Sequence, residues 1–215
     1  MDLNPLIVDE NGAIAADARI VIDHCNNTGD RYAHMAIYPY PVHLVQEWQM
    51  NDGTTVTIRP IRPEDAEMEQ EFVKNMSDES RYYRFMDTLR ELTQTMLVRF
   101  TQIDYDREMA LIATITHDDG REEQIGVARY VTNPDGESVE FALAVGDKWQ
   151  KCGVGRKLLT ALIDCARQRG HRAVIGDVLS TNTKMFHLMS SLGFTIHPHP
   201  DDTSVKRVVK PLTPN

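Results

Sequence analysis

A glycine-containing turn between an apolar strand and an amphipathic helix restricts the fold of this chain more than any other feature of its sequence. The run Val139–Val145 is apolar apart from one glutamate, and Gly155–Arg169 carries apolar side chains at helical spacing. Between them stands the hexapeptide Gln150-Lys151-Cys152-Gly153-Val154-Gly155. Glycines let a backbone approach an anion closely, and the N–H groups at a helix start attract phosphate oxygens. The turn therefore indicates phosphate binding, with a plain strand-to-helix connection as the alternative.

The cations around this turn favour the phosphate hypothesis. Arg156 and Lys157 stand in the first helical turn, and Lys148 and Lys151 precede it. Positive charge at a helix N-terminus opposes the helix dipole, and a bound anion compensates for it. The spacing is not that of the Walker motif, because no Gly-Lys-Ser/Thr follows, nor that of the dinucleotide-binding G-x-G-x-x-G motif.

The segments on either side of this unit predict a mixed α/β domain, with an antiparallel meander first and a helical crossover later. Strands are expected at 55–59, 109–116, 124–132, 138–145, 173–178, from 194 onward and at 204–209. Helices are expected from about 62 and over 77–100, 155–169 and 182–192. Ahead of them, two apolar runs, 6–8 and 18–22, are joined across Asn11-Gly12 and predict a hairpin, and the residues that follow it show no sustained period. We therefore expect a hairpin at 1–23, an extended linker at 24–53 and the main domain at 54–212.

The composition limits the class of protein. At 215 residues, with 41% hydrophobic and 26% charged residues, the chain has the balance of an ordinary globular protein. No apolar run reaches the roughly 18 residues of a membrane helix, and the first residues lack a secretory signal, so we expect a cytoplasmic protein without membrane partners. The formal charge of −9 argues against nucleic-acid binding and suits a cationic substrate. The three cysteines form no C-x-x-C pair, so neither a metal site nor a disulfide framework is expected.

The hexapeptide and its surroundings resemble the GNAT superfamily of N-acetyltransferases. Its spacing is similar to the family signature Q/R-x-x-G-x-G/A, and Val139–Val145 is similar to the fourth strand of the family. Downstream, the segment from Asn182 to Phe194 is similar to the asparagine-containing helix that ends in Leu-Gly-Phe. The resemblance implies an α/β (α+β) fold with a mixed, mostly antiparallel sheet and helices on both faces. It also implies fourth and fifth strands that splay apart, with a bulge in the fourth.

The same resemblance implies acetyl-CoA as the acyl donor, with no metal. The pantetheine arm is expected along the fourth strand, and the phosphates in the glycine turn. Asn182 is expected to bond to the cofactor arm, and Lys184 to touch a phosphate or to be a solvated helix lysine. The implied cofactor residues are Leu143, Ala144, Val145, Gln150, Lys151, Cys152, Gly153, Val154, Gly155, Arg156, Asn182 and Lys184.

Glu140 stands where similar protein acetyltransferases carry their general base. An amine must lose a proton before it attacks a thioester, because a free lysine has a pKa of about 10.4. The alternative for Glu140 is an outward-facing, solvated carboxylate. Backbone N–H groups near Leu143 are expected to polarise the thioester carbonyl. Many family members protonate the leaving thiolate with a tyrosine, but Met189 occupies that position, which leaves water, Ser190 or no specific acid.

Further segments resemble the Pat-type bacterial protein lysine acetyltransferases, in which a synthetase-like region precedes a GNAT domain. Residues 2–7 and 16–20 resemble the C-terminal end of the ATP-grasp part of NDP-forming acyl-CoA synthetases, as a remnant too short to form a nucleotide site. The similarity continues through Tyr38-Pro39-Tyr40-Pro41, Ile58–Ala66 and Ser80–Phe85. It implies N-ε-lysine acetylation of a target protein such as an acyl-CoA synthetase.

Two other functions remain open on the sequence. The chain is either a small-molecule amine N-acetyltransferase or a non-catalytic acetyl-CoA-binding regulatory remnant. Arg81 and Arg84 are expected either to shape the substrate side of the cleft or to pair with helix neighbours such as Glu79 and Asp87.

Overall fold

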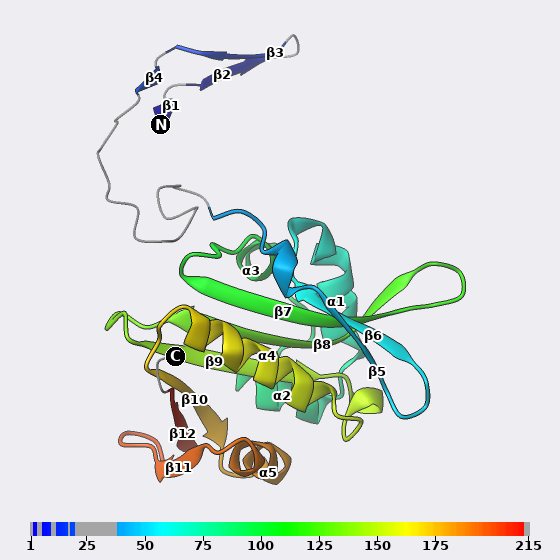
Figure 1. Ribbon diagram of the computed structural model, residues 1–215, viewed down its shortest axis with the longest axis vertical. Coiled ribbons are helices and arrows are strands. Elements are labelled where there is room, and N and C mark those ends of the chain that lie inside the picture. Colours follow the sequence, from blue (N-terminus) through cyan, green and yellow to red (C-terminus); the bar gives the residue numbers. More distant parts are fainter. Residues whose placement is uncertain (1, 4–5, 10–11, 17, 20–37, 213–215) are drawn as a thin grey trace. The chain divides into compact units, whose positions relative to one another are not determined.

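The computed structural model describes residues 2–3, 6–9, 12–16, 18–19 and 38–212, and the chain forms two compact units, Met1–Ala36 and Ile37–Asn215 (Figure 1). The first unit contains β1 (Asp2–Leu3), β2 (Leu6–Asp9), β3 (Gly12–Ala15) and β4 (Ala18–Arg19). Strands β2 and β3 pair as an antiparallel hairpin, and β1 pairs with β4.

The hairpin expected across Asn11-Gly12 is present, but its second strand is β3 rather than the run at 18–22. The pairing of Asp9 with Gly12 leaves only two residues for the loop, so the chain reverses immediately. The backbone N–H of Gly12 donates a hydrogen bond to Asp9 Oδ1 at 3.1 Å. Residues 20–22 of the predicted run lie outside the described residues.

The second unit is built on an eight-stranded sheet in the order β11-β12-β10-β9-β8-β7-β6-β5. All neighbouring strands are antiparallel except β9 and β10, which are parallel and joined by the crossover helix α4. The strands are β5 (Gln46–Gln49), β6 (Thr55–Pro60), β7 (Glu108–Thr116), β8 (Glu122–Thr132), β9 (Ser138–Val145), β10 (Ala173–Leu179), β11 (Thr195–Pro198) and β12 (Val205–Pro211).

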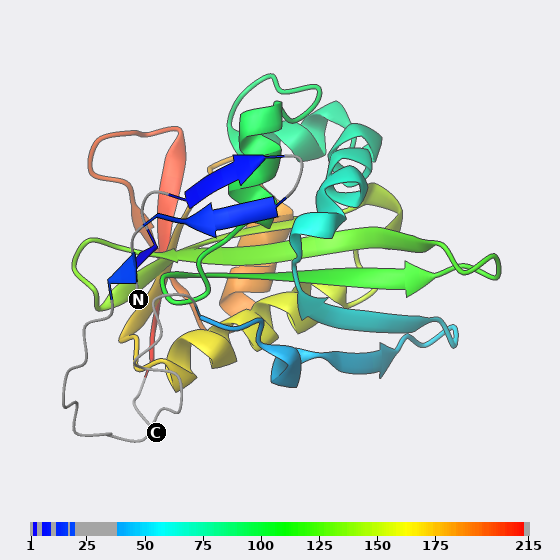
Figure 2. The same ribbon diagram turned by 90° about the horizontal axis from the view of Figure 1, so that it is seen from above.

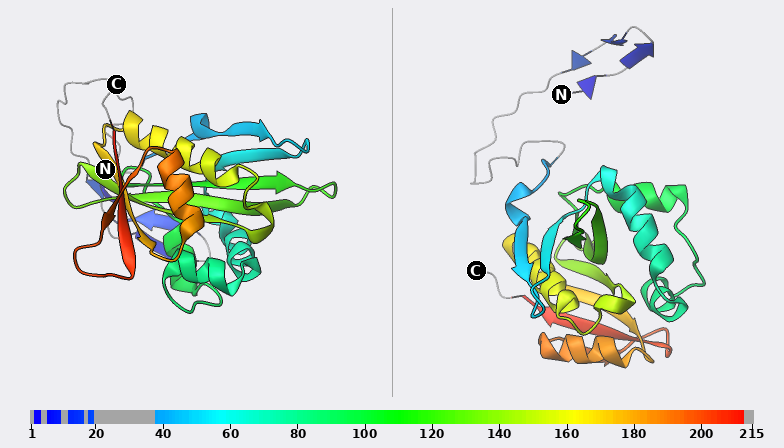
Figure 3. Two further views of the ribbon diagram at one scale, coloured as in Figure 1. Left: turned by 90° about the horizontal axis from the view of Figure 1, so that it is seen from below. Right: turned by 90° about the vertical axis from the view of Figure 1, so that its right-hand side faces the viewer.

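Helices cover both faces of this sheet, as predicted. They are α1 (Ala66–Asn75), α2 (Asp78–Phe85), α3 (Gln94–Thr101), α4 (Val154–Gln168) and α5 (Thr183–Ser191), with short 3-10 helices at Val42–Leu44, Pro63–Asp65 and Asp147–Trp149. Helices α1 to α3 lie on one side of the long strands β7 and β8, and α4 lies on the other (Figures 2 and 3). The mixed α/β architecture expected from the sequence is therefore confirmed.

Each face of the sheet has its own apolar core. The amphipathic stripe of α4 is buried against one face at Leu158, Leu159, Leu162 and Ile163. Full burial of such a side chain stabilises the folded state by roughly 1.5–3 kcal/mol. The apolar stripe therefore provides much of the free energy that holds α4 against the sheet. The opposite core contains Ile61, Phe72, Val73, Met76, Leu92, Ala110, Ile112, Val127 and Ala144.

The sheet begins earlier in the chain than the boundary expected at Thr54. Strand β5 lies within the segment assigned to the linker, yet it pairs with β6 from Gln46 to Gln49. Its Trp48 packs against the main core. A four-residue edge strand with one apolar anchor has too little periodicity to stand out in a sequence, which explains why it was not predicted.

The single helical region predicted over 77–100 consists of two helices. Ser77 caps α2 as expected, because its Oγ accepts a hydrogen bond from the N–H of Ser80 at 3.2 Å. Helix α2 ends where Met86 adopts a left-handed conformation with φ of 54°. Thr93 then caps α3, its Oγ1 accepting from the N–H of Met96.

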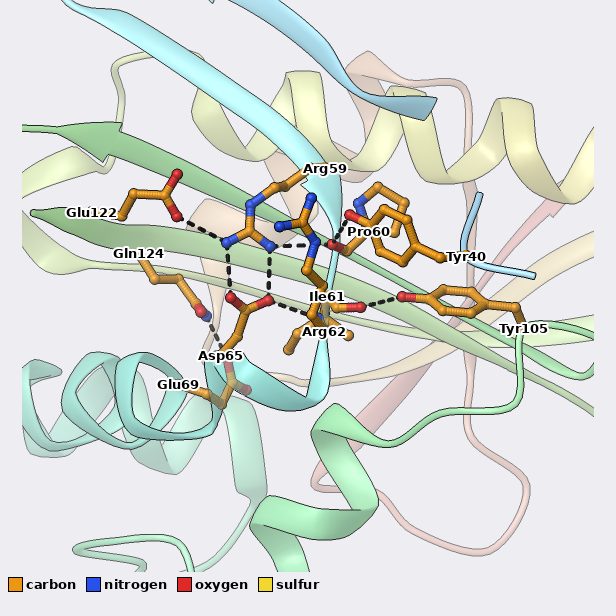
Figure 4. A network of polar contacts seen from close by, with 10 residues as sticks. All are labelled: Tyr40, Arg59, Pro60, Ile61, Arg62, Asp65, Glu69, Tyr105, Glu122 and Gln124. Carbon is orange, nitrogen blue, oxygen red and sulfur yellow. Dashed lines mark hydrogen bonds and ion pairs between the residues drawn. The ribbon is translucent and has the colours of Figure 1, made fainter. Parts of the chain in front are cut away.

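A buried ion-pair network fixes the start of α1 to β6 (Figure 4). The guanidinium of Arg59 donates two hydrogen bonds to Asp65, at 2.7 and 2.8 Å, and one to Glu122 at 2.9 Å. Asp65 also accepts the backbone N–H of Arg62 at 2.7 Å. Burial disfavours the charged guanidinium, but Asp65 and Glu122 outweigh this effect and raise the pKa of Arg59.

Candidate active site

Strands β9 and β10 separate after three paired residues, and the candidate site lies where they part. Ser138, Val139 and Glu140 pair with Ala173, Val174 and Ile175, and no pair follows further along the two strands. At this point the ring of Phe141 lies against Gly176, where an added Cβ would be 2.6 Å from Cε1 of the ring. Phe141 therefore acts as a wedge, and only a glycine in the neighbouring strand leaves room for it.

The splay expected for the fourth and fifth strands is thus confirmed, but the bulge expected in the fourth strand is not. The register of β9 with β8 runs without a shift from Val139 to Val145. The separation follows instead from the volume of Phe141 on the β10 side. A wedge of this kind was not apparent from the sequence, because Phe141 also fits an ordinary buried strand position.

The glycine turn after β9 adopts the concave backbone that its sequence indicates. Lys151 and Gly153 both have positive φ, of 65° and 91°. Alternation of left- and right-handed residues directs successive N–H groups toward one point, which is the geometry of an anion site. The indole of Trp48 packs against the turn, and its Cη2 atom is 3.4 Å from where a Cβ at Gly153 would lie. The ammonium of Lys157 lies 5.5 Å from the centre of the Trp48 ring.

A pocket of about 340 Å³ lies between β9, the turn, α2 and α5. Its lining includes nearly all the candidate cofactor residues: Leu143, Ala144, Val145, Gln150, Lys151, Gly153, Gly155, Arg156, Asn182 and Lys184. The remaining lining residues are Met76, Glu79, Ser80, Tyr83, Arg84, Trp149, Met185 and Leu188. The glycine turn and the cations beside it therefore form one end of the pocket, and the walls of the pocket are largely apolar.

Three candidate residues lie outside this lining. Val154, the first residue of α4, is buried in the core, and Cys152 is exposed. Glu140 is exposed on β9. Alternation along the strand gives Glu140 the same face as Ala142 and Ala144. Glu140 stands three residues before Leu143, the first residue of β9 in the pocket lining.

Polar contacts join α2 to the glycine turn. The carboxylate of Asp147 accepts hydrogen bonds from the N–H and Oγ of Ser77, both at 2.8 Å, and from Ser80 Oγ at 2.7 Å. Burial raises the pKa of Asp147, but these hydrogen bonds outweigh burial and lower it overall. Gln150 donates to Ser80 Oγ at 3.1 Å and accepts from Lys184 Nζ at 3.2 Å. The contacts hold α2, the turn and α5 around one opening.

Asn182 has a structural role besides its place in the pocket. Its Oδ1 accepts the N–H of Met185 at 3.1 Å and so caps α5. Asn182 also lies in the lining of the pocket. Met189 is fully buried in the core, and Ser190 is exposed outside the pocket lining.

The sequence reasoning did not identify the α2 wall of the pocket, apart from the proposal that Arg84 shapes the substrate side. Within α2, Glu79 and Tyr83, and likewise Ser80 and Arg84, are spaced four residues apart and so share one helix face, which is a pattern present in the sequence. Arg81 instead donates hydrogen bonds to carbonyls at the end of α1, including Lys74 O at 3.1 Å, and pairs with Asp78. Its role is structural.

A slot between splayed strands, closed at one end by a helix-starting anion turn, defines an acyl-coenzyme A-binding acyltransferase. The comparisons with known proteins agree with this class. The family model "Acetyltransferase (GNAT) domain" matches residues 55–195. An acetyltransferase of Pseudomonas aeruginosa is 34% identical over 155 residues, covering 72% of this chain and 83% of the relative. The chain belongs to the GNAT acetyltransferase family.

Two further relatives are of the Pat type. Acetyltransferase Pat of Mycolicibacterium smegmatis is 29% identical over 185 residues, and the match covers 82% of this chain but 53% of that protein. The crystal structure of the GNAT domain of S. lividans PAT is similar with a TM-score of 0.74 and 33% identity, covering 81% of this chain and all of that one. The ATP-grasp remnant expected at the N-terminus stays a prediction.

Family membership establishes the protein as an acyltransferase that uses acetyl-CoA. The residues present fit that donor, since the anion turn, Lys151, Arg156 and Lys184 gather at one end of the pocket. Among the described residues, no group of three His, Cys, Asp or Glu side chains is placed to hold a metal ion. Within the same residues, no helix is long and apolar enough to cross a membrane.

Proposed function

We propose that the protein transfers acetyl from acetyl-CoA to the ε-amine of a lysine in a target protein. The observation that carries this proposal is the open position of Glu140 on β9, beside the pocket but exposed rather than enclosed. A carboxylate there is accessible to a side chain that enters from a second protein. The similarity to Pat-type acetyltransferases supports the same substrate class.

In this mechanism the lysine nitrogen loses its proton to Glu140, directly or through water, and attacks the thioester carbonyl carbon. The developing oxyanion is stabilised by backbone N–H groups of the unpaired part of β9, near Leu143. The C–S bond then breaks, and the thiolate leaves with the coenzyme. Met189 cannot protonate it, and the hydroxyls that line the pocket belong to Ser80 and Tyr83, so water or one of these supplies the proton.

The test is transfer of radiolabelled acetyl from acetyl-CoA to purified acetyl-CoA synthetase, with a panel of polyamines alongside. We expect label on one lysine of the synthetase, located by mass spectrometry of the digested product. Label that reaches the small amines alone would assign the protein to small-molecule acetylation. Binding of coenzyme A without transfer to any acceptor would indicate the non-catalytic alternative.

The role of Glu140 is tested by Glu140→Gln, with Glu67→Gln as the matched control because Glu67 is an exposed glutamate on α1 outside the pocket lining. We expect Glu140→Gln to lower turnover about 100-fold or more and to leave the dissociation constant for coenzyme A unchanged. Glu67→Gln should alter neither. Unchanged turnover in Glu140→Gln would show that another group is the base.

A further inference from the structure

Arg84 is a cation in the pocket wall, and it lacks a hydrogen-bond acceptor among the residues that the structure describes. Its guanidinium carbon lies 4.9 Å from the ring centre of Phe85 and 5.9 Å from that of Phe100. Within the described part of the chain, no carboxylate or carbonyl oxygen accepts a hydrogen bond from it. Arg84 is partly buried, and its side chain contributes to the lining of the pocket. A guanidinium in such a place is stabilised when a ligand supplies the missing acceptor.

The position of Arg84 distinguishes it from the cations around the anion turn. The first residues of α2 contact that turn through Asp147 and Gln150. Arg84 is seven residues after the helix cap Ser77, which corresponds to about 10 Å along a helix axis. It therefore lines the opposite end of the pocket from Lys151 and Arg156.

This opposite end is the side on which the acyl acceptor is expected. The charge of Arg84 interacts with that of Arg129, which is paired with Ala142 across strands β8 and β9. Ala142 lies on β9 between Glu140 and Ala144, on the same strand face. Arg84 is thus beside the segment of β9 that runs from the proposed base to the pocket wall.

The protein does not balance the positive charge at this end. Arg84 and Arg129 both interact with the buried carboxylate of Glu69, which lies 3.4 Å from Arg129 and also accepts a hydrogen bond from Gln124. Arg129 interacts with Glu108 as well, but that carboxylate is paired with a third cation, Arg99, at 2.6 Å. Burial and the nearby charge of Arg129 lower the pKa of Arg84 to about 10 despite the opposing effect of Glu69. Glu79 lines the same pocket but is exposed, and it accepts a hydrogen bond from Tyr83. Among the described residues of this cluster, the cations Arg84, Arg129 and Arg99 therefore face the two carboxylates of Glu69 and Glu108, and an anionic ligand group would supply the missing negative charge.

We propose that Arg84 forms an anion subsite that binds a carboxylate carried by the acceptor molecule close to its reactive amine. The guanidinium suits this ligand because its planar fork donates two parallel hydrogen bonds to a carboxylate. The carboxylate comes either from an acidic side chain next to the acceptor lysine of a protein or from the α-carboxylate of a free amino acid. The inference rests on the proposed transfer to an amine and adds a selectivity to it.

The experiment compares acceptors that differ only in that charge. One arm uses two lysine peptides, with glutamate or glutamine next to the lysine, and the other uses free amino acids and their carboxamides. For each pair kcat/KM is measured in the wild type, in Arg84→Met and Arg84→Lys, and in the control Arg121→Met, which changes an exposed arginine. Arg84→Met keeps an apolar stem against Phe85 and Phe100, and circular dichroism checks its fold.

We expect the wild type and Arg121→Met to prefer the carboxylate member of at least one pair by about 10-fold or more. Arg84→Met should abolish this preference through KM for the acceptor, with KM for acetyl-CoA unchanged. Arg84→Lys should keep part of it, because a point charge replaces the fork. A preference in the peptide arm supports a protein substrate, and one confined to free amino acids supports the subsite while refuting lysine acetylation.

Two results would overturn the subsite and leave acetyl transfer standing. The first is equal use of both members of every pair by the wild type, and the second is a raised KM for acetyl-CoA in Arg84→Met, which would assign Arg84 to the donor. If no acceptor is acetylated, calorimetric binding of the two peptides in the presence of coenzyme A decides. Tighter binding of the glutamate peptide that is lost in Arg84→Met upholds the subsite, and equal binding refutes it.

Discussion

The wedge between β9 and β10 predicts the effect of one added methyl group. In Gly176→Ala the new Cβ would lie 2.6 and 2.9 Å from Cε1 and Cδ1 of Phe141, distances that real atoms do not adopt. The ring must rotate or β10 must move. Overpacking of this kind typically costs about 1–3 kcal/mol. A ring displaced toward the gap between the strands would narrow the slot, so we also expect the dissociation constant for coenzyme A to rise.

A double-mutant cycle with Phe141→Leu tests whether the ring is the cause. Leucine is smaller and branched, so Gly176→Ala should cost less in that background, with a coupling of about 1 kcal/mol or more. Urea unfolding followed by tryptophan fluorescence provides the free energies, because both tryptophans, Trp48 and Trp149, belong to the sheet domain. A cost below about 0.5 kcal/mol, or the same cost in both backgrounds, would refute the wedge.

Three more outcomes follow from contacts around the site. Asp65→Ala leaves the buried Arg59 without its main partner and should lower the free energy of unfolding by about 3–5 kcal/mol in urea titrations, whereas joint replacement of both by apolar residues should cost less. Gly153→Ala forces an alanine to a φ of 91° and should cost about 1–3 kcal/mol and weaken coenzyme A binding, measured by calorimetry. Asp147→Asn should reduce stability at pH 7. Because the folded pKa of Asp147 is lowered from 3.8, the difference from wild type should fade as the pH falls below 3.8, and a pH-independent difference would contradict this.

The part of the fold that could be predicted from the sequence is the part with strong local signals. The strand Ser138–Val145 is observed at the predicted bounds, and the predicted helix 155–169 is observed as Val154–Gln168. A continuous apolar strand, a pair of glycines and a long amphipathic stripe each restrict the backbone without help from distant residues. The anion turn follows from the same segment, since positive φ at Gly153 is a local property.

The parts that could not be predicted depend on contacts between distant residues. The pocket wall provided by α2 arises because Asp147 accepts hydrogen bonds from Ser77 and Ser80, which are 67 to 70 residues away in sequence. Strand β5 is defined by pairing with β6 and not by its own composition. The splay depends on Phe141 meeting Gly176, and neither residue is unusual in its own strand. In each case the structure depends on a contact between two residues that are distant in the sequence. A single sequence does not show which of its residues come into contact.

The side chains of strand β9 form two sets that point to opposite faces of the sheet. Val139, Phe141 and Leu143 point into the main core, whereas Glu140, Ala142 and Ala144 share the other face. Substitution of Val139, Phe141 or Leu143 would disturb the core that supports the pocket. Glu140 is exposed and contributes little to packing. Under the role proposed for Glu140, the catalytic group and the packing of the strand depend on different residues. Replacement of that carboxylate would then leave a folded domain that still binds acetyl-CoA but no longer transfers acetyl, so a single substitution would convert the proposed enzyme into a sensor of its own donor.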